Sequence, residues 1–226
     1  PQRLHPRHRP GRAHGSGPAH GLCRAGPPDA PATGRKRLSQ GADLPHMKVL
    51  LDANVLYPTV MREVLLAVAK EGLFTPLWSD RLLEEWARAA RKLGPEGEPQ
   101  ARAEIALTRA AWPEACVTYP PSLEARLWLP DAADTHVLAA AIAGSADLIL
   151  TQNARDFPSH ILTEEGLERQ DADGFLMELW LAHPAAVERA VQRVAATARD
   201  MAGEDMTLRA LLKKARLPRL GKALAG

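Results

Sequence analysis

The sequence lacks the features of a secreted or membrane protein. It has two cysteines, Cys23 and Cys116, and neither has a neighbour at metal-site spacing. We therefore expect no disulfide framework and a reducing compartment. No apolar run approaches the roughly 20 residues that span a membrane, and the first residues lack the apolar stretch of a signal peptide. These absences predict a cytoplasmic protein without a membrane partner.

The chain also lacks a strong net charge, although its charge is unevenly distributed. The formal net charge is +2, but residues 1–46 carry eight Lys and Arg against two Asp, which leaves −4 on the remainder. A mildly acidic body argues against a protein that coats nucleic acid by bulk charge. With 226 residues, of which 46% are hydrophobic, the chain is long enough for one core and an appendage.

Residues 1–46 are rich in Pro, Gly, Arg and His and contain almost no large apolar residues. Such a segment cannot bury enough surface to offset the entropy of ordering, so we expect it to be disordered. It holds five of the eight histidines, whose irregular spacing indicates composition bias and not a metal site. Met47 directly precedes the first apolar run, and we expect it to be the natural start, with the residues before it as upstream sequence.

Beyond residue 46, short apolar strands alternate with helical periodicity, which predicts an α/β domain with a parallel sheet over residues 47–170. The expected strands are 48–51, 73–77, 117–119, 147–151 and 166–170, and the expected helices are 59–71, 80–93, 99–111 and 135–143. Thr59 is the expected cap of the first helix. Helices at 171–182, 185–202 and 207–224 predict a C-terminal extension over residues 171–226. The last helix is basic, and phosphate contact and a solvated face both remain open for it.

Polar residues gather where the predicted strands end. Asp52 directly follows the first strand, and Asn54 is expected to hold the adjoining loop by hydrogen bonds. Asp131 and Asp134 lie at the start of the helix 135–143, and two carboxylates in one turn exceed what capping needs. Because the carboxyl ends of parallel strands meet at one edge of a sheet, we expect these side chains to form a site.

Glu84 and Glu85 are successive residues on the helix 80–93. They point about 100° apart, so only one of them can face the site. His136 follows the acidic turn, and a single histidine at the start of a helix is assigned no role.

The order and spacing of four motifs are distinctive. They are VLLDANVL at 49–56, SDRLLEEW at 79–86, DAADTHVLAAA at 131–141 and ADLILTQNARDF at 146–157. Together they resemble the PIN-domain ribonucleases, including the VapC-type toxins of bacterial toxin–antitoxin pairs. This resemblance implies a three-layer α/β/α domain with a short central parallel sheet. The C-terminal helices also resemble the extension of a VapC-type subgroup.

The resemblance also implies residue roles. The implied catalytic residues are Asp52, Glu85 and Asp134, the implied metal ligands are Asp52, Glu85, Asp131, Asp134 and Asp156, and the implied site-lining residues are Asn54, Thr151 and Asn153. One position departs from the family pattern, because many PIN domains have a fourth acid where this chain has Asn153. Asn153 as a neutral ligand and Asp156 as a carboxylate both remain open for that position.

Clustered carboxylates repel one another unless a cation neutralises them, and hard oxygen ligands select Mg²⁺ or Mn²⁺. We therefore expect a Mg²⁺- or Mn²⁺-dependent endoribonuclease. The resemblance further implies the toxin of a toxin–antitoxin pair, with RNA as substrate and an antitoxin that inserts a basic side chain among the carboxylates. It also implies a homodimer, for which the apolar face of the helix 59–71 is the expected contact.

Three other interpretations compete with this one. A non-catalytic PIN-like binding module is favoured by Asn153 and opposed by the remaining acids. A housekeeping RNA-processing nuclease keeps the chemistry without the toxin role. A receiver or haloacid-type hydrolase also places an Asp after its first strand, but such a hydrolase needs a second Asp where this chain has Asn54.

Overall fold

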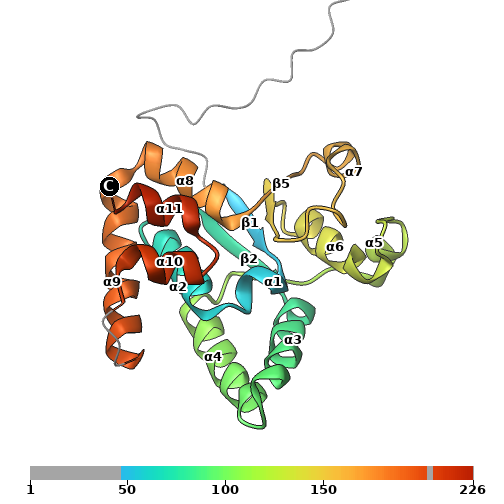
Figure 1. Cartoon of the computed structure of the whole chain (residues 1–226). Coiled ribbons are helices and arrows are strands. Elements are labelled where there is room, and N and C mark those ends of the chain that lie inside the picture. The colour runs from blue at the N-terminus through green and yellow to red at the C-terminus, as the bar shows by residue number, and fades with distance from the viewer. Residues whose placement is uncertain (1–46, 203–205, 226) are drawn as a thin grey trace, which may run out of the picture. The chain divides into compact units, whose positions relative to one another are not determined.

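A five-stranded sheet forms the centre of the structure, a computed structural model in which residues 47–202 and 206–225 are described (Figure 1). The strands are β1 (Lys48–Leu51), β2 (Thr75–Ser79), β3 (Cys116–Val117), β4 (Leu148–Leu150) and β5 (Glu168–Gln170). Their order is β3-β2-β1-β4-β5, and every neighbouring pair is parallel. The strand order reverses between β1 and β4, so a crevice is expected beyond the carboxyl ends of these two strands.

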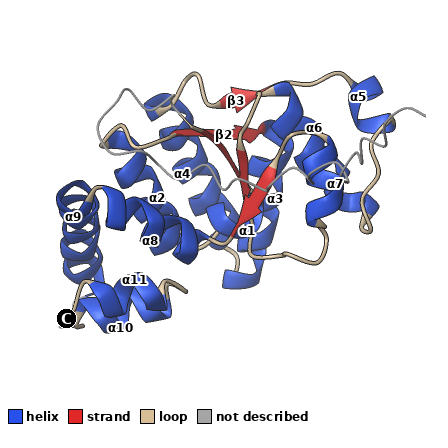
Figure 2. Cartoon of the chain, turned by 90° about the horizontal axis from the view of Figure 1, so that it is seen from above, coloured by secondary structure: helices blue, strands red, loops and turns tan. Residues whose placement is uncertain are grey.

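Helices cover both faces of the sheet, as the three-layer prediction requires. The helices are α1 (Ala53–Leu56), α2 (Thr59–Lys70), α3 (Asp80–Ala89), α4 (Gly97–Ala111), α5 (Pro121–Ala125), α6 (Thr135–Ala143), α7 (Ser159–Glu164), α8 (Ala172–Ala182), α9 (Pro184–Ala202), α10 (Leu208–Lys214) and α11 (Pro218–Ala223). Two 3-10 turns, η1 (Ala90–Leu93) and η2 (Ala132–Asp134), complete the set. Figure 2 shows α2 and α6 on opposite sides of the strands. The predicted α/β/α fold is therefore confirmed.

Central strands and α6 supply the middle of the core. Val49, Leu50 and Leu51 of β1 are fully buried, as are Ile149 and Leu150 of β4. A strand that is buried on both faces carries a continuous apolar run, which is the pattern of a covered parallel sheet. Helix α6 is buried along nearly its whole length. The end of β1 and the start of α6 are thus held rigidly by packing.

The C-terminal helices pack against α2. Buried α2 residues, among them Met61, Leu65 and Val68, join the core, and α9 lies along this helix. Glu71 at the end of α2 accepts hydrogen bonds from Arg189 and Arg193 of α9 at 2.8 and 2.7 Å. The expected dimer contact through the apolar face of α2 is therefore wrong, because the chain's own extension covers that face.

Local differences from the predicted elements have identifiable causes. Strand β2 begins two residues later than predicted, because its ladder with β1 starts at Thr75 and the Phe74 ring packs edge-on against Phe175. Thr59 is the first residue of α2 and does not cap it, since Pro58 occupies the cap position. The short helices α1, α5 and α7 were not predicted, because four to six residues are too few to show a period.

The described residues include no helix that is both long and apolar enough to cross a membrane. The predictions for residues 1–46 lie outside the described residues. The boundary at residue 170 stays a prediction.

A buried arginine of α2 contacts three other helices. Arg62 of α2 is only 1% exposed. It donates hydrogen bonds to the carbonyl of Leu56 at the end of α1 (2.9 Å) and to Glu104 of α4 (2.6 Å). Its guanidinium also lies 4.2 Å from the ring centre of Trp86 in α3, an arrangement that is favourable for a cation above an aromatic face.

Replacement of this arginine is expected to destabilise the fold. Arg62→Met should lower the free energy of unfolding by about 3 kcal/mol, because it leaves the Leu56 carbonyl without its donor and the partly buried Glu104 carboxylate without its cation. Arg88→Met is the control, since Arg88 is mostly exposed in its pair with Glu84, and it should cost less than about 1 kcal/mol. Urea denaturation measures both, and equal losses would contradict the assigned role of Arg62.

Candidate active site

The ends of β1 and β4 are joined by a hydrogen-bond network around Asp52. This residue directly follows β1 and is 6% exposed. Its Oδ2 atom accepts hydrogen bonds from Thr151 Oγ1 (2.7 Å) and Asn54 Nδ2 (2.5 Å). Asn54 Oδ1 in turn accepts from the backbone N–H of Gln152 at 2.9 Å. Asn54 and Thr151, which were predicted to line the site, thus hold the Asp52 carboxylate in one orientation.

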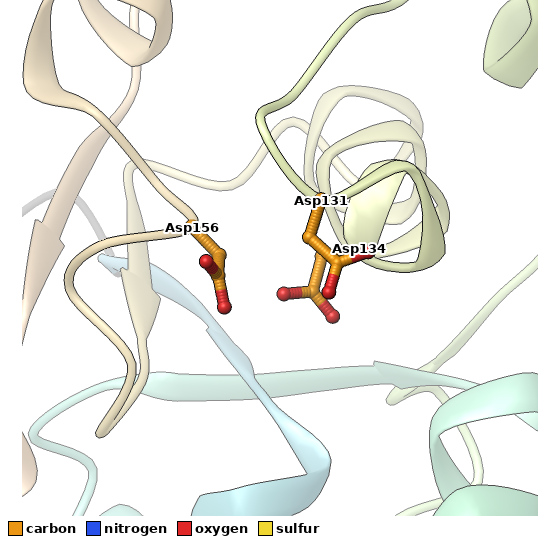
Figure 3. A group of neighbouring side chains, drawn as sticks. All are labelled: Asp131, Asp134 and Asp156. Atoms are coloured by element: carbon orange, nitrogen blue, oxygen red, sulfur yellow. The ribbon is translucent and has the colours of Figure 1, made fainter.

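Three carboxylates converge beside this network. Figure 3 shows Asp131 and Asp134, at the turn before α6, pointing toward Asp156 on the loop that follows β4. One carboxylate oxygen from each lies within 4.8 Å of the others. Asp131 is exposed, whereas Asp134 and Asp156 are half-buried. Asp131 also accepts a hydrogen bond from the Ala133 N–H at 2.8 Å, so this carboxylate caps the turn as well as belonging to the group.

Asn153 and Asp156, the two candidates for the fourth site position, make different contacts. The Asp156 carboxylate is a member of the three-acid group. Asn153 Nδ2 donates a hydrogen bond to Asp156 Oδ2, and the Asn153 N–H donates to Thr151 Oγ1 at 3.0 Å. Asp156 therefore offers the charged oxygen, and Asn153 holds it in place.

The two glutamates of α3 have different surroundings. Glu84 is bound by Arg88 and Arg102, which lower the pKa of its carboxyl. Glu85 Oε1 lies 2.9 Å from His136 Nε2. The negative charge of Glu85 also helps to raise the pKa of Asp52. Glu85 is thus the glutamate that faces the acidic residues, although it is not a member of the three-acid group among the described residues.

His136 is a site residue that the sequence reasoning missed. Its ring is fully buried at the start of α6. Although Nε2 lies close to Glu85, neither ring nitrogen makes an aligned hydrogen bond within the described part of the chain. The signal was present in the sequence, because a histidine inside a helix that is apolar on all sides must be buried, and a buried polar group needs a partner.

Residues 48–155 match the family model of the PIN domain. Comparisons with curated proteins and with solved structures gave no match. The matched segment covers four of the five strands and every predicted site residue except Asp156, which is the next residue along. PIN domains are generally nucleases, so the match supports a nuclease-type fold for this segment. The VapC-type specificity stays a prediction, and so does the resemblance of the C-terminal extension.

Electrostatic repulsion is concentrated where the acidic side chains meet at the carboxyl ends of β1 and β4. Burial, followed by the charges of Asp52, Asp131 and Asp156, raises the pKa of Asp134 to about 6, and His136 acts in the opposite direction. Burial likewise raises the pKa of Asp52, although the hydrogen bond from Thr151 acts to lower it. Carboxyl groups held together against their own repulsion are characteristic of functional sites.

The donor set fits a hard divalent cation. Asp131, Asp134 and Asp156 offer oxygen atoms close enough to share one ion. Oxygen ligands of this kind suit Mg²⁺ or Mn²⁺. Such an ion would also relieve the repulsion that raises the pKa of Asp134.

The raised pKa of Asp134 predicts a pH-dependent stability. A carboxyl whose pKa is higher in the folded state binds its proton more tightly there, so the metal-free protein loses stability as the pH rises from about 4 to about 6. Asp134→Asn removes this loss. Above pH 6, in EDTA, the variant should unfold at a higher urea concentration than the parent, and the difference should shrink below pH 4.

Asp200→Asn is the matched control, because Asp200 is exposed on α9 away from the acidic group. It should show no such pH-dependent difference from the parent. A stability difference for Asp134→Asn that is constant across the pH range would contradict the prediction.

Proposed function

We propose that this chain is a Mg²⁺- or Mn²⁺-dependent endoribonuclease that cleaves RNA phosphodiester bonds and acts as the toxin of a type II toxin–antitoxin pair. The observation that carries the nuclease proposal is the convergence of Asp131, Asp134 and Asp156 beside Asp52, at the point where the strand order of a PIN-like sheet reverses. The toxin role rests on the resemblance of the sequence motifs to VapC-type toxins.

Each site residue has a role in this proposal. Asp131, Asp134 and Asp156 hold the cation, with Asp52 and Glu85 completing the acidic surroundings. A bound Mg²⁺ or Mn²⁺ would supply an activated water for attack on phosphorus and offset the charge that develops on the phosphate. Thr151 and Asn54 orient the Asp52 carboxylate through its Oδ2 atom, which leaves Oδ1 without a donor from either side chain.

The exposure of the acidic group suits a polymeric substrate. Asp131 is exposed and Asp134 and Asp156 are half-buried, so a phosphodiester within a long strand has access to their oxygens. Small-molecule sites instead bury most of their ligand in an enclosed pocket. The open, acidic edge therefore favours cleavage within a chain over the processing of a small metabolite.

The competing binding-module interpretation loses its main support. It rested on Asn153 in place of a fourth acid, whereas the Asp156 carboxylate lies in the acidic group and Asn153 donates a hydrogen bond to it. Three carboxylates that could hold a cation favour a catalytic protein over a binding module. A housekeeping nuclease differs from a toxin only in its biological role, which growth experiments distinguish.

RNA cleavage tests the nuclease proposal directly. The full chain should cut a mixed RNA pool with Mg²⁺ or Mn²⁺ and should not cut it in EDTA. Asp134→Asn should reduce the rate at least about 100-fold, because it removes a charged ligand from the cation site. Asp200→Asn should cut like the parent. Cleavage that persists in EDTA and in Asp134→Asn would refute the proposal.

Expression in bacteria tests the toxin role. The parent chain should arrest growth, the Asp134→Asn variant should not, and co-expression of the product of an adjacent gene should restore growth. Growth is followed by optical density. An active nuclease that leaves growth unaffected would favour the housekeeping role.

A further inference from the structure

The helical hairpin of α10 and α11 is strongly basic. Its cationic side chains are Arg209, Lys213, Lys214, Arg216, Arg219 and Lys222, and all of them are exposed. Residues 206–226 contain no Asp or Glu. Within the described residues, Arg219 is the member of this set that forms ion pairs, with Asp171 and Asp173. The other five cations therefore face solvent.

This positive charge contrasts with the rest of the folded chain. Residues 206–226 carry +6, whereas residues 47–205 carry −10. A polyanion that approaches the acidic edge is repelled by the body of the protein, so its attraction has to come from a local basic surface. Within residues 47–226, the hairpin has the composition to supply one.

A buried aspartate of α8 holds the start of α11 in place. Asp173 of α8 is 4% exposed, and its two carboxylate oxygens accept hydrogen bonds from the N–H groups of Arg219 (2.8 Å) and Leu220 (3.0 Å) in the first turn of α11. The Arg219 side chain also donates to Asp171 at 3.2 Å. Asp171 directly follows β5. The start of α11 is thus fixed at the carboxyl end of an edge strand.

That strand end lies beside the candidate active site. The Thr151 N–H donates to the carbonyl of Gln170, the last residue of β5, at 3.1 Å. Thr151 also donates its hydroxyl hydrogen to Asp52. Parallel strands lie about 4.8 Å apart, so β5 is about 10 Å from β1 along the same edge. Both views place the turn between α10 and α11 on the side of the hairpin that faces α1 (Figures 1 and 2).

The turn between α10 and α11 contains an arginine with an unusual backbone conformation. Arg216 has φ of 61°, the left-handed region that favours glycine. The N–H groups of Arg216 and Leu217 donate to the carbonyls of Lys213 and Leu212, which closes the end of α10. Glycine would relax the backbone here, whereas arginine adopts this conformation only at a conformational cost.

We propose that Lys213, Lys214, Arg216 and Arg219, here named the basic turn, bind the phosphodiester backbone of the RNA next to the segment that enters the acidic site. This inference rests on the proposed function, since it assigns a second contact to the same substrate. Phosphates contact Lys and Arg without regard to sequence, so the basic turn supplies affinity and position, and not base specificity.

Direct binding of a labelled single-stranded RNA, measured by fluorescence anisotropy, tests this proposal without relying on cleavage. Measurements are made in EDTA in the Asp134→Asn background, so that the RNA stays intact, over a range of salt concentrations. Lys213→Gln with Lys214→Gln should weaken binding and reduce the slope of log K against log salt by about 1.4, which corresponds to two lost phosphate contacts on a single strand.

Two further variants make the result interpretable. Arg216→Gly removes a charge while relaxing the turn, so it should fold at least as stably as the parent and still reduce the slope by about 0.7. Lys70→Gln with Lys92→Gln is the matched control, because both lysines are exposed on other elements, and it should leave the slope unchanged.

The outcomes separate the two proposals. A lower slope for the basic-turn variants supports the RNA-binding surface even if the parent cuts no RNA, in which case only the nuclease proposal fails. Slopes and affinities equal to those of the control overturn the RNA-binding surface even if the parent is an active nuclease.

Discussion

The hydrogen bond from Thr151 to Asp52 joins residues that are 99 positions apart, at the ends of the two central strands. The candidate site depends on this junction because the parallel pairing of β1 with β4 brings two separate parts of the chain to one edge. Asp52 comes from the first part, and Asp134 and Asp156 flank the second. Without the register that sets Leu51 opposite Leu150, these carboxylates would not lie at one edge of the sheet.

The pairing of β1 with β4 also brings several carboxyl groups close together, and their charges repel one another. Burial and mutual repulsion raise the pKa values of Asp52 and Asp134, and the fold holds these groups in place through packing of β1 and α6. Arg62 supports the arrangement from beneath, since it fixes the end of α1 and stacks on Trp86, the residue after Glu85. Stability in the surrounding core thus offsets electrostatic strain at the edge, an arrangement that is common where groups are placed for chemistry.

The C-terminal helices connect to this edge in two ways. Helix α9 covers the apolar face of α2 and is held there by Glu71. Helix α11 begins beside α8, whose buried Asp173 accepts its first N–H groups. The extension therefore completes the core on the α2 side of the sheet, and its last two helices carry the positive charge. An acidic group and a basic surface are the two features that the proposed cleavage of a polyanion would use.

Local pattern in the sequence was sufficient for the strands, for the α/β class and for the placement of Asp52, Asp131 and Asp134 at element ends, because strand and helix periods and turn chemistry are properties of neighbouring residues. The family resemblance had already favoured Glu85. The contact of Glu85 with His136, the place of Asp156 beside Asp134, the burial of His136 and the covering of α2 by α9 were decided by tertiary structure alone. Each of these depends on contacts between residues far apart in the chain. Such contacts follow from strand order and helix packing, which no local period encodes.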